Sequence, residues 1–455
     1  MTHASPSRPT VADIRDLFCQ RSLWQTWLDV ESALAQTQAE LGMIPAEAAA
    51  EVRRKANFEH IDEQALAADI ARTQAPIASL ARMLAAACDG DAGGYVHWGA
   101  TTQNVMQTAR TMLMRRAHEA FMGRLGDVLL DLAGLADEGA EMLMAGRTNF
   151  RHALPITFGF KVAGWIDEFL RHRERFAGAE PRVFASLWGG AVGAMHAFGV
   201  QGPELNRRLS ARLGLMPLAV PSRSANDYVA EYILLLALFS ASCSKVAREL
   251  YILMADEIGE VYERQDTDVV GSSTMPNKVN PKVAVKVIAL SARLRTLTPL
   301  ALEAMQPTHE GDAANNQMLY ALIDQACPLA YELVCSMDEL LACVGLAPEN
   351  MRRNLVSAGQ SIAAESAMMI LAPVIGRTQA YQAVKNAIAA ASERRLALLE
   401  VLLEDDSVRN AIGRDALGKA LDPAAYTGQS AAMARDMGAA ARVAAASLAT
   451  RGIAV

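Results

Sequence analysis

Long stretches of apolar residues at helical spacing are the feature that most constrains this 455-residue chain. Alanine, leucine and methionine dominate these stretches and β-branched runs are scarce, which favours helix nearly everywhere. Several of the predicted helices are very long. A helix of that length is not stabilised by one small core, so its partners must run alongside it, as in a bundle to which several subunits contribute. The sequence therefore predicts an all-α protein built around a bundle of long helices.

The helical patterns, and the glycine and proline clusters between them, divide the chain into three predicted domains. Residues 1–104 form a small N-terminal helical domain that ends in a polar segment around His97. Residues 105–355 form a central long-helix bundle that carries the polar loop 268–284. Residues 356–455 form an alanine-rich C-terminal helical domain.

Caps and breaks predict the boundaries of individual helices. Ser22 is predicted to cap a helix that ends at Gly42. Residues 62–88 are predicted to form a single helix, and a long helix is expected to run from 105 to about 145. Another long helix is predicted from 227 to about 262. Its middle is apolar all round, which places it inside the bundle.

Charge and cysteine usage bound the partners and the compartment. The chain carries 43 Lys and Arg residues against 50 Asp and Glu residues, a formal net charge of −7. A mildly acidic protein binds nucleic acid and anionic membranes poorly, so neither is an expected partner. Six cysteines without a C-x-x-C pair or metal-ligand spacing predict reduced thiols and no bound metal. The N-terminus lacks the apolar core of a signal peptide, and the run Tyr232–Cys243 is too short to span a bilayer, so we expect a cytoplasmic protein.

A polar loop between two apolar helical patterns contains the densest set of chemically useful side chains. The loop reads Gly271-Ser-Ser-Thr-Met-Pro-Asn-Lys-Val-Asn-Pro281. Its glycine and prolines predict defined turns. Ser272 and Ser273, with Lys278 and Asn280 close by, provide a candidate base or nucleophile, a fixed positive charge and an amide donor. An ordinary exposed linker can have the same composition, so the residue types alone leave both interpretations open.

The complete string resembles the signature loop of the fumarase/aspartase superfamily, G-S-S-x-M-P-x-K-x-N-P, and every fixed position is matched. The superfamily includes fumarase, aspartase, argininosuccinate lyase, adenylosuccinate lyase and the bacterial 3-carboxy-cis,cis-muconate cycloisomerases. Other stretches of the chain are most similar to the branch of the cycloisomerases and adenylosuccinate lyase-like enzymes. The resemblance implies three helical domains, a homotetramer with a twenty-helix core, active sites shared by three subunits, and catalysis without a cofactor.

A second segment resembles the superfamily pattern H-x-G-x-T-S-x-D. It reads His97-Trp-Gly-Ala-Thr-Thr-Gln-Asn104, so that the family's serine is Thr102 and its aspartate is Asn104. Hydroxyl groups just ahead of a helix can cap its free N–H groups, or they can hold a substrate carboxylate at the helix N-terminus. Because the signature loop is present, we favour carboxylate binding by Thr101 and Thr102, and the resemblance places His97 in the site.

A third segment resembles the pattern G-R-T-H-x-Q-x-A-x-P with two substitutions. The family's histidine is Asn149 and its glutamine is Arg151. In fumarase and adenylosuccinate lyase that histidine pairs with a glutamate, whose position is occupied here by Val285. Both halves of the His–Glu pair are therefore absent. A poor leaving group such as hydroxide needs a general acid, so we expect a better one, such as a lactone carboxylate or a stabilised nitrogen group.

The resemblance also implies the chemistry. A base removes the proton from the carbon next to a carboxylate, donors stabilise the resulting aci-carboxylate, and the β-group then leaves. Ser272 matches the base, which works only if nearby N–H groups and Lys278 stabilise its alkoxide. The predicted catalytic residues are Ser272, His97 and Lys278. The predicted substrate-binding residues are Thr101, Thr102, Thr148, Asn149, Arg151, His152, Ser273, Met275, Asn280 and His309, although His309 also fits a solvated helix start.

Three functions follow as hypotheses. The leading one is a cofactor-independent lyase that reversibly breaks a C–N or C–O bond of a succinyl-type polycarboxylate and gives fumarate or a fumarate-like product. The near alternative is a lactonising cycloisomerase of the 3-carboxy-cis,cis-muconate type. The remote alternative is a non-enzymatic structural descendant. The presence of Ser272, Lys278 and Asn280 argues against the last, because a structural role requires none of them.

Overall fold

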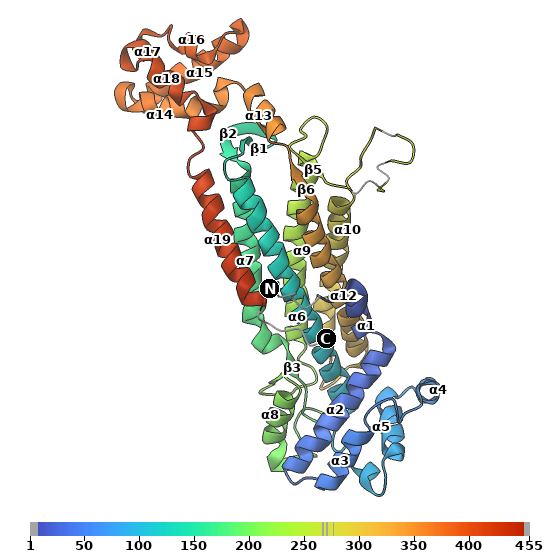
Figure 1. Cartoon of the computed structure of the whole chain (residues 1–455). Helices are drawn as coiled ribbons and strands as arrows, with labels where there is room; N and C mark the ends of the chain where they lie inside the picture. The colour runs from blue at the N-terminus through green and yellow to red at the C-terminus, as the bar shows by residue number, and fades with distance from the viewer. Residues whose placement is uncertain (1–7, 266–267, 270–271, 276, 450–455) are drawn as a thin grey trace, which may run out of the picture.

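A computed structural model describes residues 8–265, 268–269, 272–275 and 277–449 of the chain. Figure 1 shows an elongated body with long helices in the middle, a helical group at the N-terminal end and a second helical group at the C-terminal end. The first part of the chain forms α1 (Val11–Leu17), α2 (Gln20–Glu40), α3 (Ala46–Lys55), α4 (Glu63–Thr73), α5 (Pro76–Ala87) and the 3-10 turn η1 (Ala92–Tyr95).

The middle of the chain forms the long bundle. Its helices are α6 (Thr102–Glu138), α7 (Phe158–Val183), α8 (Gly202–Arg212), α9 (Asp227–Leu253), α10 (Val283–Arg295), α11 (Thr298–Ala304) and α12 (Ala313–Cys343), with the turn η2 (Gly199–Gln201). The short strands are β1 (Leu143–Thr148), β2 (Arg151–Thr157), β3 (Ala185–Ser186), β4 (Met216–Pro217), β5 (Val261–Glu263) and β6 (Val344–Leu346). The prediction of an all-α fold is confirmed, because the strands form only three two-stranded pairs among the described residues.

Two ion pairs show how the longest helices run. Arg110 of α6 pairs with Asp324 of α12 at 3.2 Å, and Arg124 pairs with Asp338 at 3.3 Å. Both pairs span the same sequence separation of 214 residues, so α6 and α12 run side by side in the same direction. Both helices therefore carry the chain from the N-terminal end of the body to the opposite end (Figure 1).

The centre of the bundle is filled by aromatic rings from three helices. Phe121 of α6 lies edge-on to Phe176 of α7, with ring centroids 5.1 Å apart, and edge-on to Phe239 of α9 at 5.0 Å. Edge-to-face pairs of this kind add to the stabilisation from apolar burial. These contacts lock α6, α7 and α9 together, and so they fix where the two ends of each helix lie.

The long helix predicted from 105 to about 145 is wrong at its end. α6 ends at Glu138, and β1 and β2 form an antiparallel hairpin that includes Ala145. Gly139 and Gly159 explain the break, because the Gly159 N–H donates to the Gly139 carbonyl at 2.8 Å and brings two backbones together. A Cβ atom on Gly159 would lie 2.5 Å from the Ala136 carbonyl oxygen, so only glycine permits this approach.

Three other helix predictions need correction. The helix at 62–88 is divided into α4 and α5, because Gln74 adopts a left-handed conformation and Pro76 starts α5. The helix predicted from 227 to 262 ends at Leu253, before β5. Cys19, not Ser22, is the N-cap residue of α2. The predicted end near Gly42 is correct within two residues, since α2 ends at Glu40.

The C-terminal part of the chain forms a small helical group with its own core. Its elements are α13 (Pro348–Ser357), η3 (Gln360–Ala363), α14 (Ala364–Ile375), α15 (Arg377–Arg394), α16 (Leu398–Leu402), α17 (Asp406–Ala411), α18 (Arg414–Ala420), η4 (Pro423–Ala425) and α19 (Ser430–Ala449). Buried side chains of α14 to α18 and the chain just after them form a hydrophobic cluster separate from the bundle. α19 leaves this group and packs along α6 and α7 (Figure 1).

The apolar helix α9 is a core helix by its position. By length and composition, α9 could cross a membrane. The bent pair formed by α13 and the segment Gln360–Ile375 reaches that length only if the two are counted as one span. However, 61% of the most apolar 18-residue stretch of α9 is buried inside the chain. Leu238, Tyr251 and Ile252 of α9 are exposed, so part of its apolar surface is not covered by the described residues.

Candidate active site

The signature loop is tied together at its base by two side chains. The Glu263 carboxylate, at the end of β5, accepts hydrogen bonds from the backbone N–H groups of Lys282 at 2.6 Å, Val283 at 3.1 Å and Ala284 at 2.8 Å. Gln265 donates from Nε2 to the Asn280 carbonyl at 2.8 Å. A carboxylate on the free N–H groups of a helix start is favourable both as a cap and as a charge near the positive end of the helix dipole.

Glu263 thus sets where the loop ends and where α10 begins. We predict that Glu263→Ala lowers the free energy of unfolding by about 1–2 kcal/mol, because three backbone donors at the start of α10, of which that of Ala284 is buried, lose their acceptor. The variant should also lose activity, since the loop that carries Lys278 is no longer fixed at its base. Urea unfolding and steady-state kinetics measure the two effects. Glu263→Gln, which keeps an acceptor oxygen, is the matched control, and an alanine variant as stable as the parent would contradict the assignment.

The Ser272 hydroxyl lies in a cradle of backbone donors. Its Oγ accepts hydrogen bonds from the N–H of Met275 at 3.1 Å and from the N–H of Thr274 at 3.4 Å. These are the groups that would stabilise a serine alkoxide. Ser273 is exposed, and its Oγ lies 3.5 Å from the Thr274 hydroxyl. Gly271 and Pro276 of the signature lie outside the described residues.

The remaining loop residues line one hollow. Lys278 is exposed and its backbone N–H donates to the Met275 carbonyl at 3.0 Å. Met275, Lys278 and Asn280 face a hollow of about 660 Å³ against the C-terminal end of α9 and the turn that follows it. This wall includes Asp256 and Glu257. The loop therefore places a positive side chain beside space large enough for a small molecule.

The third segment forms the tip of the β1–β2 hairpin. Asn149 and Phe150 are the two turn residues, with φ angles of 48° and 60°. Two residues with positive φ are typical of a type I′ hairpin turn, at which asparagine is a favoured residue. The turn geometry is a structural reason for asparagine at position 149. Thr148, Arg151 and the other tip residues are exposed, and Phe150 is 86% exposed.

A buried ion pair fixes the hairpin to the base of the signature loop. Arg147 donates to both carboxylate oxygens of Glu260, at 2.7 and 2.9 Å, and the Glu260 side chain is completely buried. Asn354 of α13 also donates to Glu260 at 2.9 Å. His152 lies nearby, and partial burial together with the positive charge of Arg147 lowers its pKa. Both effects favour the neutral form of the His152 ring. Arg151 has no side-chain partner among the residues that the structure describes.

The second segment lies at the start of α6. Thr101 is the N-cap residue of α6, and its backbone N–H donates to Asn104 Oδ1 at 3.1 Å. Thr102 is exposed in the first turn. His97 has a φ of 60°, and its Nδ1 lies 2.6 Å from Glu31 Oε1 on α2. The first N–H groups of an α-helix lack intrahelical carbonyl partners, and a carboxylate can bind to such groups.

His309 belongs to the same end of the molecule as His97. It is exposed, with a φ of 51°, in the segment before α12. Gly311 of this segment packs against the guanidinium of Arg223, and Arg223 Nε donates to Gln103 Oε1 at 2.8 Å. Arg223 thus connects the start of α12 to the start of α6. His97 and His309 both hold positive φ angles.

One chain does not bring the three segments together. The His97 segment precedes α6, and the hairpin follows α6. α6 has 37 residues, and an α-helix rises about 1.5 Å per residue, so these segments lie roughly 55 Å apart. The hairpin and the base of the signature loop share one end of the body, whereas the His97 segment and His309 share the other (Figure 1). No side chain can span that distance.

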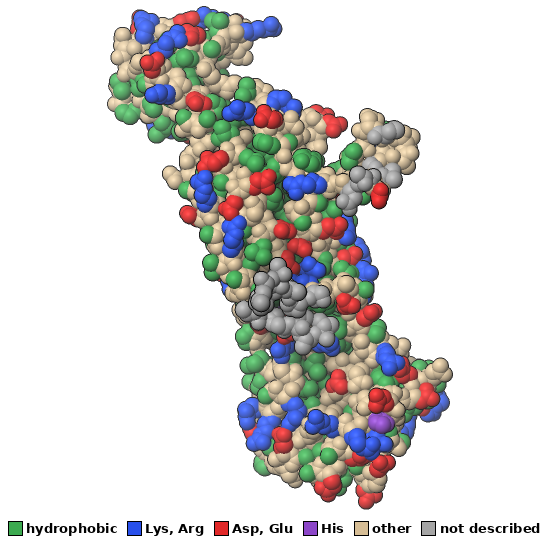
Figure 2. Space-filling model, in the orientation of Figure 1, with side chains coloured by type: hydrophobic (Ala, Val, Ile, Leu, Met, Phe, Trp, Pro, Cys, Tyr) green, Lys and Arg blue, Asp and Glu red, His purple; other side chains and the backbone are tan. Residues whose placement is uncertain are grey.

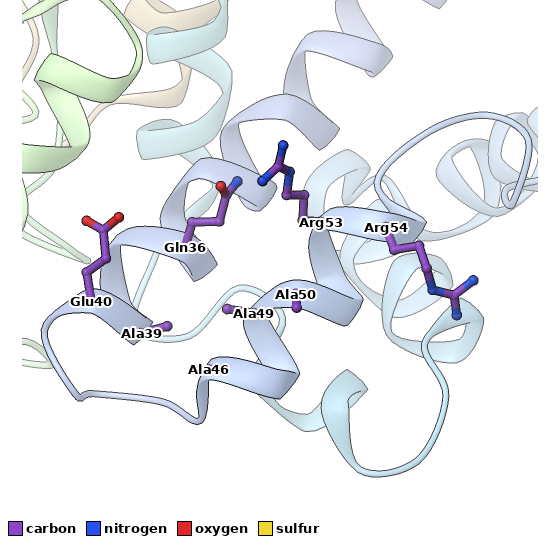
Figure 3. A pocket seen from close by; sticks show the side chains of 8 residues that line it. All are labelled: Gln36, Ala39, Glu40, Ala46, Ala49, Ala50, Arg53 and Arg54. Atoms are coloured by element: carbon purple, nitrogen blue, oxygen red, sulfur yellow. The ribbon is translucent and has the colours of Figure 1, made fainter.

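Outside these segments, the described residues line further hollows but offer no candidate metal site. They contain no group of three or more His, Cys, Asp or Glu side chains that could hold a metal. A hollow of about 530 Å³ lies between α2 and α3 over a floor of alanines (Figure 3). Its rim consists of Gln36, Glu40, Arg53 and Arg54, but Glu40 is paired with Arg212 and Arg54 with two acidic residues. The hollow includes none of the predicted site residues.

Three glutamates of the site were not predicted from the sequence. Glu31, Glu260 and Glu263 are buried, and each binds a candidate site segment. A glutamate within an apolar helical pattern, such as Glu31 between Leu28 and Leu34, is the signal that could have indicated a buried polar role.

Comparisons with known proteins agree over nearly the whole chain. A family model described as "Lyase" matches residues 8–295, and one described as "Adenylosuccinate lyase C-terminus" matches residues 360–437. The chain is 37% identical to adenylosuccinate lyase of Methanothermobacter thermautotrophicus, with 95% of this chain and 97% of the relative aligned. It is 33% identical to N-acetyl-S-(2-succino)cysteine lyase of Dickeya dadantii, with 91% of each aligned. The crystal structure of 3-carboxy-cis,cis-muconate lactonizing enzyme from Pseudomonas putida superimposes with a TM-score of 0.84 at 29% identity, covering 96% of this chain and 97% of that one.

Proposed function

The chain belongs to the fumarase/aspartase superfamily of lyases, and we propose that it catalyses a reversible β-elimination on a succinyl-type polycarboxylate without a cofactor. The observation that carries this proposal is the Ser272 hydroxyl, whose oxygen accepts two backbone hydrogen bonds inside a fully matched signature loop. A base of this kind suits the removal of a proton from carbon. The product is fumarate or a fumarate-like alkene.

The proposed reaction has two steps. The Ser272 alkoxide takes the proton from the carbon next to a carboxylate, and the C–H electron pair moves into that carboxylate to give an aci-carboxylate. Lys278 and Asn280, with Thr101, Thr102, Thr148 and Asn149, donate hydrogen bonds to the substrate carboxylates. The electron pair then returns to form the double bond, and the β-group leaves with its bonding pair. Ser273, Met275, His152 and His309 line the substrate.

The names of the relatives narrow the substrate class. Adenylosuccinate lyase and N-acetyl-S-(2-succino)cysteine lyase both carry in their names a succinyl group on another molecule. We therefore propose that this chain acts on a succinyl adduct with a leaving group better than hydroxide. Val285 and Asn149, which replace the His–Glu pair of the superfamily, agree with such a leaving group because they supply no general acid.

We propose that the active protein is a homotetramer in which three subunits contribute to each site. The separation of about 55 Å between the His97 segment and the hairpin supports this assembly, because one chain cannot complete a site. Apolar side chains also reach the surface of the bundle, and Leu130, Leu238 and Ile252 are at least 40% exposed. Figure 2 shows hydrophobic side chains along the visible face of the body, where an unpartnered bundle would expose them. In this arrangement, the domains 105–355 of the four subunits form the central bundle, and domains 1–104 and 356–455 lie at its ends.

A substrate panel tests the proposal and separates it from its alternatives. The ultraviolet absorbance of the new double bond is measured over a set of succinyl adducts of amines, alcohols and thiols and over 3-carboxy-cis,cis-muconate. Elimination from a succinyl adduct supports the lyase. Lactonisation of the muconate alone would favour the cycloisomerase, which the likeness to the lactonizing enzyme keeps as the alternative. No reaction with any member would favour a non-enzymatic descendant.

The exposed Arg151 gives a further prediction. Its guanidinium, unpaired among the described side chains of this chain, is free to bind a second substrate carboxylate or an anionic leaving group. Arg151→Gln, which restores the superfamily residue, should lower kcat/KM for the true substrate by about tenfold or more, the scale of one charge-assisted hydrogen bond. Light scattering should show an unchanged tetramer. A tetramer that dissociates would instead indicate that Arg151 makes an ion pair between subunits.

A further inference from the structure

Glu31 is a buried acid with a single partner. Its side chain is completely buried on α2, and Oε1 lies 2.6 Å from His97 Nδ1. The other oxygen, Oε2, is buried and has no hydrogen-bond partner among the described residues. Trp27, Leu28 and Leu34 of the same helix are also buried. A carboxylate in such a place needs a positive partner, because the removal of a lone charge from water is costly.

The negative charge of Glu31 sets the protonation state of His97. Burial favours the neutral imidazole, but the hydrogen bond and the negative charge of Glu31 outweigh it, so the pKa of His97 is raised. Among the described residues, no charged group other than Glu31 acts on the His97 ring. The loop before α8 presents Phe198 and Ala197 to Gly99, and Glu31 is the charged group that acts on the ring. His97 Nδ1 is occupied by Glu31, so Nε2 is the nitrogen that remains for a ligand.

We propose that Glu31 is a positioning residue that holds His97 as an imidazolium, with Nε2–H free to bind a substrate carboxylate at the start of α6. This inference rests on the proposed function, which requires a site for a polycarboxylate. It adds a cation to a segment that otherwise offers only the helix N-terminus and the Thr101 and Thr102 hydroxyls. The His–Glu pair of the superfamily is absent here, since positions 149 and 285 are Asn and Val. The chain has another His–Glu pair, His97 with Glu31, to which we assign a role in substrate binding.

The sign of the pH effect follows from the raised pKa. His97 binds the substrate only while it is protonated, so KM should rise as the pH increases through its folded pKa. Glu31→Gln removes the charge and lets burial dominate. The rise in KM should then begin at a lower pH. The part of the pH–rate profile that is set by the Ser272 base should stay at the same pH. A substitution with only a structural effect would lower the rate at every pH and would not shift one part of the profile alone.

The direct test is a histidine titration by NMR on protein labelled at its histidines, with the His97 signal assigned by its loss in His97→Gln. In the wild type, His97 should titrate above about 6.5, the ordinary pKa of a histidine. In Glu31→Gln its pKa should fall by at least about 1 unit, the usual effect of one close opposite charge. Asp29→Asn is the matched control, because Asp29 lies on the same helix and bonds to Gln25 instead. It should leave the His97 titration unchanged.

Calorimetric binding of succinate, a simple dicarboxylate, completes the test. Glu31→Gln should weaken succinate binding at neutral pH, and Asp29→Asn should not. A His97 that titrates at or below about 6.5 in the wild type, the ordinary pKa of a histidine, would overturn the inference, even if Glu31→Gln failed to fold. So would a shifted titration with unchanged succinate binding. The titration and the succinate binding can both give the expected results while the substrate panel shows no elimination. In that case the proposed function is wrong, but the proposed role of Glu31 in holding His97 protonated still stands.

Discussion

Ser272→Ala is expected to lower kcat by at least ~100-fold, the typical scale of general acid–base catalysis, while the fold is unchanged. The structure gives the physical reason, since the Ser272 oxygen accepts hydrogen bonds from the N–H groups of Thr274 and Met275. These donors lower the cost of forming an alkoxide. Alanine removes the oxygen but leaves both donors in place, so the loss reports on the base and not on the loop.

Ser273→Ala is the matched control for this result. The neighbouring Ser273 is exposed, and among the described residues its hydroxyl pairs with the Thr274 hydroxyl and with no backbone N–H. Without such backbone donors for an alkoxide, it should contribute far less to the rate. Steady-state kinetics on both variants, with circular dichroism to check the fold, decide between them. If Ser273→Ala is the inactive variant and Ser272→Ala turns over normally, the base has been assigned to the wrong serine.

Mixing two inactive variants is expected to restore activity. One carries Ser272→Ala, and the other carries His97→Gln at the opposite end of the body. Because the start and the end of α6 lie roughly 55 Å apart, Ser272 and His97 of one site must come from different chains. Some mixed tetramers then contain sites in which both residues are intact. The recovered rate should rise well above that of either parent after unfolding and refolding together.

The control for this experiment uses two changes in one segment. Ser272→Ala and Lys278→Met both lie on the signature loop, so every site in a mixed tetramer receives a defective loop. That mixture should remain inactive. Equal recovery in both mixtures, or a monomeric mass in light scattering, would contradict a shared site.

The fold was predictable from the sequence where periodicity alone decides it. The apolar spacing in α2 and α12 gave helices in the right places, because a helix that packs along a bundle needs a continuous apolar face. The β1–β2 hairpin was missed for a different reason. Residues 143–147 also fit a helical pattern, and the break depends on a backbone contact between Gly139 and Gly159 that no local pattern reveals.

The residues of the candidate site were likewise predictable only in part. Ser272, Lys278 and Thr101 belong to contiguous strings, so a motif could indicate them. The residues that hold those strings in place contact them across long separations, as Glu263 does with α10 and Glu31 with His97. A contact over 66 residues leaves no trace in spacing, and only the folded chain can show it. For the same reason, the sequence could not show that His97 and the hairpin lie at opposite ends of the body.

In the proposed mechanism, Ser272 moves a proton to and from the carbon next to a substrate carboxylate. Deuterium incorporation tests this most directly. The reaction is run in the direction of addition in deuterium oxide, with a fumarate-type product and the leaving group identified by the panel, and the adduct is examined by NMR. The wild type should place one deuterium on that carbon, and Ser272→Ala should place almost none although it still binds succinate. Incorporation by Ser272→Ala as fast as by the wild type would contradict the claim.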